Sequence, residues 1–126
     1  FDMALKERLE ARFKQAIASL ADFHGLAVEL DYQRCYPATI NTPAHAQHCA
    51  TVLAGLLGQE NVLRNPPPSM ASEDFSFLLA ERPGAYIWMG NGEDSASLHN
   101  PHYDFNDALL PLGTRYWVEL VKALLV

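Results

Sequence analysis

The stretch RPGAYIWMGNG, residues 82–92, holds a continuous apolar run between a proline–glycine turn and a second glycine. Its centre, AYIWM at residues 85–89, is typical of a strand that is covered on both faces, because no polar side chain alternates along it. Pro83 and Gly84 turn the chain into this run, and a polar loop at residues 90–106 follows it. The sequence therefore predicts a buried strand with covering layers on both sides.

A second candidate strand has a different pattern. In LAVELDYQ, residues 26–33, apolar and polar side chains alternate, which predicts a strand with one face in water, as in an antiparallel sheet covered by helices on one side. ENVLRN, residues 60–65, is a third and shorter candidate. Because the pattern changes from one wet face to two buried faces near residue 40, we predict an α/β fold with two substructures.

Helices are expected between and around these strands. Gly25 ends a first helix, Thr42 and Pro43 favour the start of a second, Ser72 is predicted to cap a third, and Asn106 or Asp107 the last. The expected ranges are 1–24, 43–57, 73–81 and a final helix through residue 124. Two hydrophobic clusters follow, one around Phe13, Ile17, Val28 and Leu30 and the other around Leu53, Ile87 and Leu120. Further core side chains are expected at Met70, Phe75, Phe77, Tyr86 and Trp88.

The composition excludes several classes of protein. The chain has 126 residues, a formal net charge of −6 and nine scattered Lys and Arg side chains, so no nucleic-acid partner is expected. No apolar run approaches the roughly 20 residues of a membrane span, so no membrane association is expected. Cys35 and Cys49 have no metal-binding or redox spacing, which predicts reduced, buried thiols in a cytoplasmic protein.

The loop after the buried strand ends in SLHNPHYDFND, residues 97–107, which is rich in side chains that can bind metals. An isolated loop histidine usually bonds a backbone carbonyl. Binding groups, however, gather on loops that follow buried strands. The residues alone leave both interpretations of His99 open, and His102 reads as a surface side chain, as do His24, His45 and His48.

Four stretches together resemble the C-terminal part of the M20 metallopeptidase family: YPATIN at 36–41, ENVLRNPPPSMASEDFSFLL at 60–79, RPGAYIWMGNG and SLHNPHYDFND. The resemblance covers essentially the whole chain. It is strongest to the N-acyl amino acid amidohydrolases, the branch with hippurate hydrolase and the plant auxin-conjugate hydrolases. It implies a partial two-domain fold. Residues 1–40 would be the terminal helix and strand of an α/β-sandwich lid or dimerisation domain, and residues 41–126 the C-terminal segment of a mixed-sheet catalytic domain.

The resemblance also implies roles for particular residues. His99, in the LHxP motif, corresponds to a metal ligand. Glu73 and Asp74 have the composition of an ordinary helix start, and the resemblance places them beside the substrate or the ligand loop, so both interpretations stay open. Asp104 is expected to hydrogen-bond the loop behind the metal ligand.

The implied reaction is hydrolysis of the amide bond of an N-acyl amino acid or small peptide by a water activated by divalent ions, namely zinc, manganese, cobalt or nickel. The other ligands and the general-base glutamate are expected in an N-terminal part, so no residue of this segment is expected to be catalytic. The segment alone is expected to be inactive and to bind no metal tightly. The complete enzyme is expected to form a homo-oligomer. A second interpretation also stays open, in which the chain is a non-catalytic interaction or dimerisation module that keeps the fold.

Overall fold

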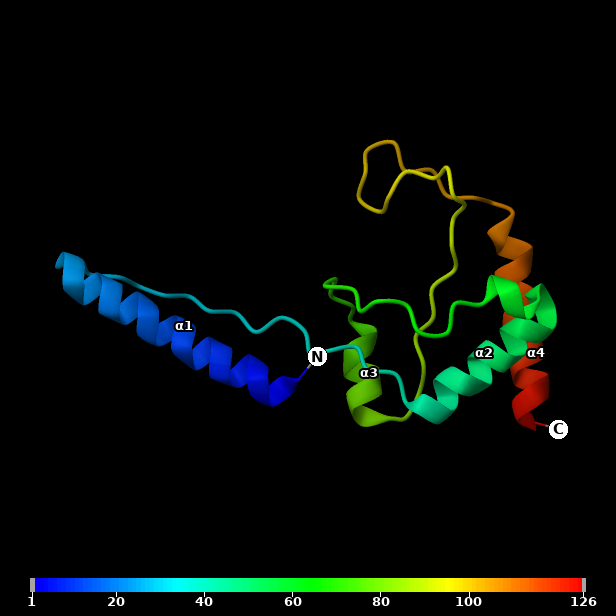
Figure 1. Cartoon of the computed structure of the whole chain (residues 1–126), viewed down its shortest axis with the longest axis horizontal. Coiled ribbons are helices and arrows are strands. Elements are labelled where there is room, and N and C mark those ends of the chain that lie inside the picture. Colours follow the sequence, from blue (N-terminus) through cyan, green and yellow to red (C-terminus); the bar gives the residue numbers. More distant parts are fainter. Residues whose placement is uncertain (1, 126) are drawn as a thin grey trace. The chain divides into compact units, whose positions relative to one another are not determined.

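A computed structural model describes residues 2–125 and divides them into two compact units. The first unit contains residues up to 40 together with residues 70–82, and the second contains residues 41–69 together with those from 83 onward. Four α-helices and one 3₁₀ helix form the regular structure of residues 2–125 (Figure 1). They are α1 (Met3–His24), α2 (Pro43–Leu57), η1 (Gln59–Asn61), α3 (Phe75–Glu81) and α4 (Leu109–Leu125).

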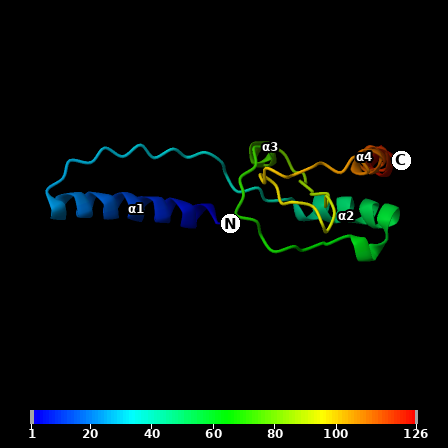
Figure 2. The same cartoon turned by 90° about the horizontal axis from the view of Figure 1, so that it is seen from above.

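The predicted strands are not formed anywhere in residues 2–125, so the described residues contain no sheet. Residues 26–33 run as an extended segment alongside α1 without a strand beside them (Figures 1 and 2). Residues 85–89 are also extended and form no ladder with another strand in the described residues, and part of the third candidate forms η1 instead. A strand is stabilised by backbone hydrogen bonds to a neighbouring strand, and the described residues place no strand beside these segments.

The limits of α1 are set by local interactions. Asp2 accepts hydrogen bonds from the backbone nitrogens of Ala4 and Leu5, at 2.9 and 3.2 Å, which satisfies two free donors of the first turn. At the other end Gly25 has a φ of 63°, and its N–H donates back into the last turn. This left-handed cap confirms the predicted end of the helix.

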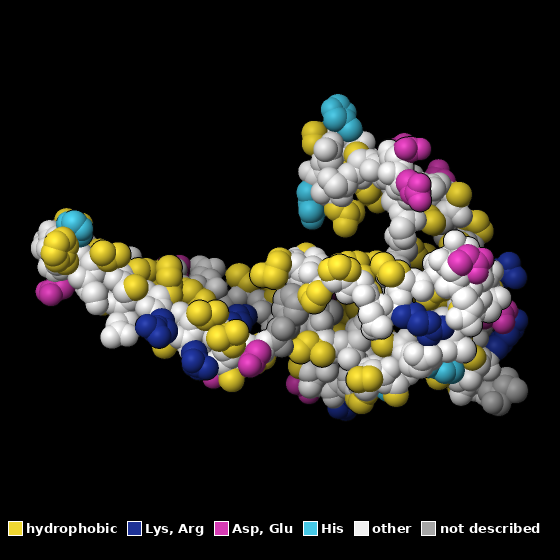
Figure 3. Space-filling view, viewed as in Figure 1, with side chains coloured by type: hydrophobic (Ala, Val, Ile, Leu, Met, Phe, Trp, Pro, Cys, Tyr) yellow, Lys and Arg dark blue, Asp and Glu magenta, His cyan; other side chains and the backbone are white. Residues whose placement is uncertain are grey.

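The apolar cluster predicted for the first unit is not buried. Phe13, Val28 and Leu30 are exposed, and Ile17 is only half-buried. Phe13 contacts the ring of Tyr32, with the ring centroids 6.1 Å apart. Figure 3 shows hydrophobic side chains in the open along α1. The cause is the missing sheet, because an amphipathic helix buries its apolar stripe only against a second layer.

Glu10 is the buried residue of α1, at 5% exposed. Its carboxylate accepts a hydrogen bond from the Arg34 Nε at 2.6 Å and a second from the Lys14 ammonium. These two cationic donors, Arg34 first, lower the pKa of Glu10 from its ordinary value of 4.5. Together with a bond from Lys6 to the carbonyl of Tyr36, the ion pair ties the extended segment to α1.

We expect acid to loosen this tie. The folded-state pKa of Glu10 lies below its value in the unfolded chain, so its stabilisation is present above about pH 4.5 and is lost as the pH falls through the folded pKa. The backbone chemical shifts of residues 26–36 should therefore move toward random-coil values between pH 6 and pH 3, whereas those of α2 should stay helical. Glu10→Gln should remove most of this pH dependence. Glu29→Gln, a change at an exposed carboxylate of the same unit, should leave it in place.

The start of α2 confirms the prediction from Thr42 and Pro43, but Thr42 does not cap the helix. Its hydroxyl accepts from the backbone nitrogen of Gly84 at 3.2 Å, and its own N–H donates to the Gly84 carbonyl at 2.9 Å. Asn41 continues this connection with two bonds to the backbone of Tyr86. The residues before α2 therefore anchor the segment that follows the Pro83–Gly84 turn.

The second predicted cluster is confirmed. Helices α2 and α4 pack together around Cys49, Tyr116 and Leu120, which are buried. The partly buried side chains against them are Val52, Leu53, Leu56, Ala85, Ile87 and Met89. Burial, followed by a hydrogen bond with Cys49, raises the pKa of the Tyr116 hydroxyl, so this phenol stays protonated.

Several other predicted core side chains are in solvent. Met70 is 90% exposed and Trp88 is 63% exposed, and Phe77 is also exposed. Phe75 and Tyr86 are half-buried. Such large apolar side chains stabilise the folded state only when neighbouring groups bury them, and the described chain supplies too few such groups.

Smaller predictions also need correction. Cys35 is exposed, whereas Cys49 is buried, and neither cysteine forms a disulfide. His24 and His45 lie on the surface as predicted. His48 does not, because it is half-buried and its Nε2 is buried without a hydrogen-bond partner in the described chain. No helix within residues 2–125 is long and apolar enough to cross a membrane.

Candidate functional site

The loop at residues 90–106 presents His99 on an unusual backbone. His99 has a φ of 65°, the only positive φ at a non-glycine residue in the described chain. It is the third residue of a turn closed by a hydrogen bond of 3.1 Å from the Asn100 N–H to the Ser97 carbonyl. Turns of this kind favour glycine or asparagine at that position. A histidine there costs on the order of 1–3 kcal/mol, and strain of this kind is often found at functional sites.

The imidazole of His99 is exposed, and no side chain or backbone group of residues 2–125 hydrogen-bonds to it. His102 is also exposed, as predicted, and its backbone N–H donates to the side chain of Asn100 at 2.9 Å. In Figure 3 histidine side chains stand out from this loop. The His99 ring is therefore available to bind a ligand.

Asp104 supports the loop through its backbone. Its carbonyl accepts a hydrogen bond of 2.7 Å from the Asn91 side-chain amide, while its carboxylate is exposed. The cap before α4, predicted at Asn106 or Asp107, is Asn106, whose Oδ1 accepts from the Ala108 N–H at 3.1 Å. The helix begins at Leu109, just after this capped turn.

Glu73 and Asp74 lie together in the first unit, just before α3. The Glu73 carboxylate accepts from the Phe75 N–H at 3.3 Å, and its carbonyl accepts from the buried Ser76 hydroxyl at 2.6 Å. A hydrogen bond and repulsion from Glu73 raise the pKa of Asp74. The predicted helix start was wrong in detail: α3 (Phe75–Glu81) begins after both acidic residues, Asp74 precedes it without a side-chain capping bond, and Ser72 is exposed.

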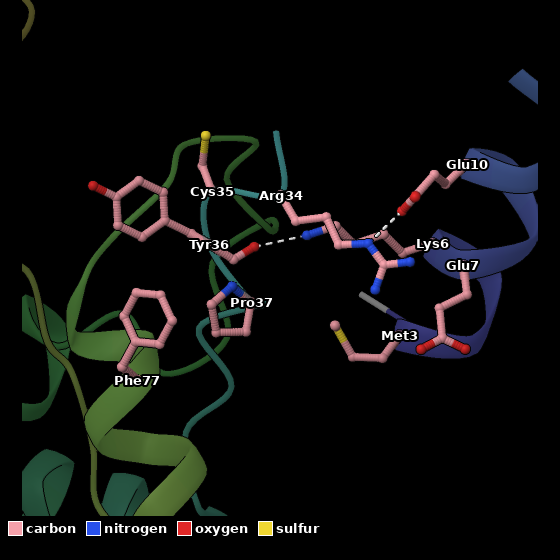
Figure 4. A pocket seen from close by; sticks show the side chains of 9 residues that line it. All are labelled: Met3, Lys6, Glu7, Glu10, Arg34, Cys35, Tyr36, Pro37 and Phe77. Atoms are coloured by element: carbon pink, nitrogen blue, oxygen red, sulfur yellow. Dashed lines mark hydrogen bonds and ion pairs between the residues drawn. The ribbon is translucent and has the colours of Figure 1, made fainter. Parts of the chain in front are cut away.

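Each unit has an open hollow on its surface. The first, about 230 Å³, lies between the start of α1 and residues 34–37, with Lys6, Arg34 and Phe77 in its wall (Figure 4). The second, about 380 Å³, is lined by residues at the base of the loop and on α4, among them Asn91, Tyr103 and Trp117. None of the predicted site residues His99, Glu73, Asp74 and Asp104 lines either hollow.

His99 can supply one ligand to a metal ion, but the described residues do not form a complete metal site. No group of three or more His, Cys, Asp or Glu side chains within the described residues is placed to hold a metal ion. The structure brings His99 and Asp104 into one loop and pairs Glu73 with Asp74. The exposed, unbonded imidazole has the chemistry of a neutral nitrogen ligand, and the other donors of a site have to come from elsewhere.

Comparison with known proteins identifies the family. A family model for peptidase family M20/M25/M40 matches residues 5–123. The chain belongs to this family. The resemblance seen in the four sequence stretches is thereby confirmed. No solved structure matches the M20 chain.

Several curated relatives are similar to this M20 chain. Hippurate hydrolase of Campylobacter jejuni is 29% identical over 94% of the chain and 31% of its own length. IAA-amino acid hydrolase ILR1-like 4 of Arabidopsis thaliana is 33% identical over 94% of the chain and 29% of its own length. The putative amidohydrolase YhaA of Bacillus subtilis is 27% identical over 85% of the chain and 28% of its own length. The chain thus spans about three tenths of the length of these relatives.

The sequence interpretation missed Asn91. Its side chain makes more hydrogen bonds to the loop than any other in that region, yet it carries no catalytic chemistry. The available signal was its place in GNG, since asparagine between glycines marks a turn. Nothing local in the sequence indicated that it would bond residues 13 and 15 positions away.

Proposed function

We propose that the chain is the C-terminal portion of a metal-dependent amidohydrolase that cleaves the amide bond of N-acyl amino acids or small peptides. The observation that carries this proposal is the family match across residues 5–123. Two of its relatives are named as hydrolases of hippurate and of indoleacetic acid–amino acid conjugates, and both names describe an acyl group joined to an amino acid. The substrate class follows from that shared chemistry.

His99 is proposed as a ligand of a divalent ion such as zinc, manganese, cobalt or nickel. Its exposed ring and its strained turn support this role. Such an ion supplies Lewis acidity for the attack of water on the amide carbonyl. The remaining ligands and a glutamate that takes the proton of the water are proposed to lie outside these 126 residues. Glu73, Asp74 and Asp104 are proposed to lie near the substrate or the ligand loop.

The α/β architecture is proposed for the complete protein. Residues 26–33 and 85–89 are already extended, and pairing with strands from the rest of the polypeptide would complete their hydrogen bonds. Residues 1–40 would then end a lid domain, and residues 41–126 would complete the catalytic domain. The solvent-exposed apolar side chains of α1, among them Leu9 and Leu20, support burial in a larger assembly, including a homo-oligomer.

A substrate assay with the complete protein tests this proposal. It should hydrolyse N-benzoylglycine, or another N-acyl amino acid or dipeptide of a panel, with release of the free amino acid. A chelator should abolish this activity, and Zn²⁺, Mn²⁺, Co²⁺ or Ni²⁺ should restore it. The 126-residue chain alone should be inactive.

The same assay distinguishes the second candidate function. If the complete protein self-associates but hydrolyses no member of the panel with any of the four metals, the chain is a non-catalytic interaction or dimerisation module. The exposed apolar surface of α1 would then be the interaction surface of this module.

A further inference from the structure

We infer that Asn91 is a positioning residue that closes the base of the loop carrying His99 and thereby fixes where the histidine can bind metal. This inference rests on the proposed function of His99. It concerns a residue that touches neither metal nor substrate and acts only through the backbone of the loop.

The hydrogen bonds of Asn91 span the loop from one end to the other. Its Nδ2 donates to the Asp104 carbonyl and to the Ser95 hydroxyl, both at 2.7 Å. Its Oδ1 accepts from the Asn106 N–H at 2.8 Å, and its carbonyl accepts from the Asn106 side chain at 3.3 Å. The side-chain amide of one residue thus binds the start, the end and the first turn of the loop.

No other residue of the described chain makes such a connection. Every hydrogen bond that joins residues 90–92 to residues 104–106 in the described chain has Asn91 as donor or acceptor. Within the loop the remaining bonds are short-range turns, such as Tyr103 N–H to the Asn100 carbonyl at 2.9 Å. Without the Asn91 side chain, the two ends of the loop would keep only the 3.3 Å bond from the Asn106 side chain to the backbone carbonyl of residue 91, and the entropy of the open loop would oppose closure.

The backbone of His99 makes this closure important. No contact of its ring holds His99 in place in the described chain, so the position of the imidazole depends on the backbone that carries it. That backbone is in the left-handed region, with a φ of 65°. Such a conformation persists only where the surroundings enforce it. The bond from the Asn100 N–H to the Ser97 carbonyl closes the turn locally, and the Asn91 bonds hold the two ends of the loop that carries this turn. Loss of Asn91 should therefore release His99 to other turn conformations.

Asn41 provides a matched control in the same unit. Its Nδ2 donates to the Tyr86 carbonyl at 2.9 Å, and its Oδ1 accepts from the Tyr86 N–H at 2.8 Å. Like Asn91 it is an asparagine that bonds a distant backbone segment through both ends of its amide. It lies before α2 and not at the His99 loop, so its loss reports on general destabilisation of the unit.

The test compares Asn91→Ala, Asn41→Ala and His99→Ala in the complete protein. Zn²⁺ affinity is measured by competition with a chelator. Asn91→Ala should weaken it about 10- to 100-fold, as for other residues that hold a ligand in place, whereas Asn41→Ala should change it less than about threefold. In the metal-free protein, hydrogen exchange of residues 92–105 should be faster in Asn91→Ala than in Asn41→Ala, with α2 and α4 equally protected.

Asn91→Asp keeps the acceptor for the Asn106 N–H but loses both donors, so its affinity should fall between those of the wild type and Asn91→Ala. If Asn91→Ala and Asn91→Asp bind Zn²⁺ as tightly as Asn41→Ala while His99→Ala binds it weakly, the inference on Asn91 is wrong and the proposed function stands. If His99→Ala binds Zn²⁺ as tightly as the wild type, the proposed role of His99 is wrong, and the inference fails with it.

Discussion

Replacing His99 with alanine in the complete protein is expected to reduce hydrolysis of N-acyl amino acids by about 100-fold or more. Changes to residues that only orient a metal ligand typically cost about 10- to 100-fold in metal affinity or activity, and loss of the ligand itself should cost at least the upper end of that range. The ring is exposed and makes no hydrogen bond in the described chain, so its removal breaks no structural contact there. Activity and metal affinity should therefore fall together.

His102→Ala is the matched control for this change. Both variants lose an exposed imidazole from the same loop, three residues apart. His102 contributes to the loop through its backbone N–H, which the substitution keeps. Its activity should stay within about threefold of the wild type, as is usual for a surface change away from a site.

A second control separates the ring from the backbone strain. His99→Gly also removes the imidazole, but glycine adopts a positive φ without cost, whereas alanine does not. The glycine variant should be the more stable of the two and no more active. If His99→Gly recovers activity, or if His102→Ala is the more damaging histidine change, then His99 is not the metal ligand.

The helices could be predicted from the sequence because their signals are local. Gly25 ends α1 and Pro43 starts α2, both as predicted. Sheets differ, since a strand is stabilised by residues far away in the chain or outside it. The pattern at residues 26–33 correctly indicates extended backbone, but no strand within the described residues pairs with it. Trp88 is exposed for the same reason, because the described residues provide no layer that covers it.

The candidate site, like the fold, has features that the sequence predicts and features that it does not. The position of His99 in a loop after an extended apolar segment was evident from the sequence, and its proposed chemistry came from the family resemblance. The closure of the loop by Asn91 was not evident, because it arises from hydrogen bonds to residues 13 and 15 positions away, and no glycine or asparagine marked the positive φ of His99. The burial of Glu10 is a third example. Its partner Arg34 lies 24 residues away, and no helical periodicity points to that pair.

Leu120→Ala is expected to have the largest effect on the stability of the 126-residue chain, a loss of about 2–5 kcal/mol. Leu120 is 9% exposed and packs with Cys49 and Tyr116 between α2 and α4. Its truncation leaves a cavity in the one buried cluster of the described chain, where several surrounding side chains are already half exposed. These neighbours can partly fill the space, which favours the lower end of the range. Urea unfolding followed by helical circular dichroism measures the change.

Leu124→Ala is the control on the same helix, one turn further on. Leu124 is 61% exposed, so the substitution removes little buried surface. It should change the free energy of unfolding by less than about 0.5 kcal/mol. Equal losses for the two variants would contradict this packing. If the loss at Leu124 grew with protein concentration, the chain would cover that face by self-association, because only a contact between copies depends on concentration.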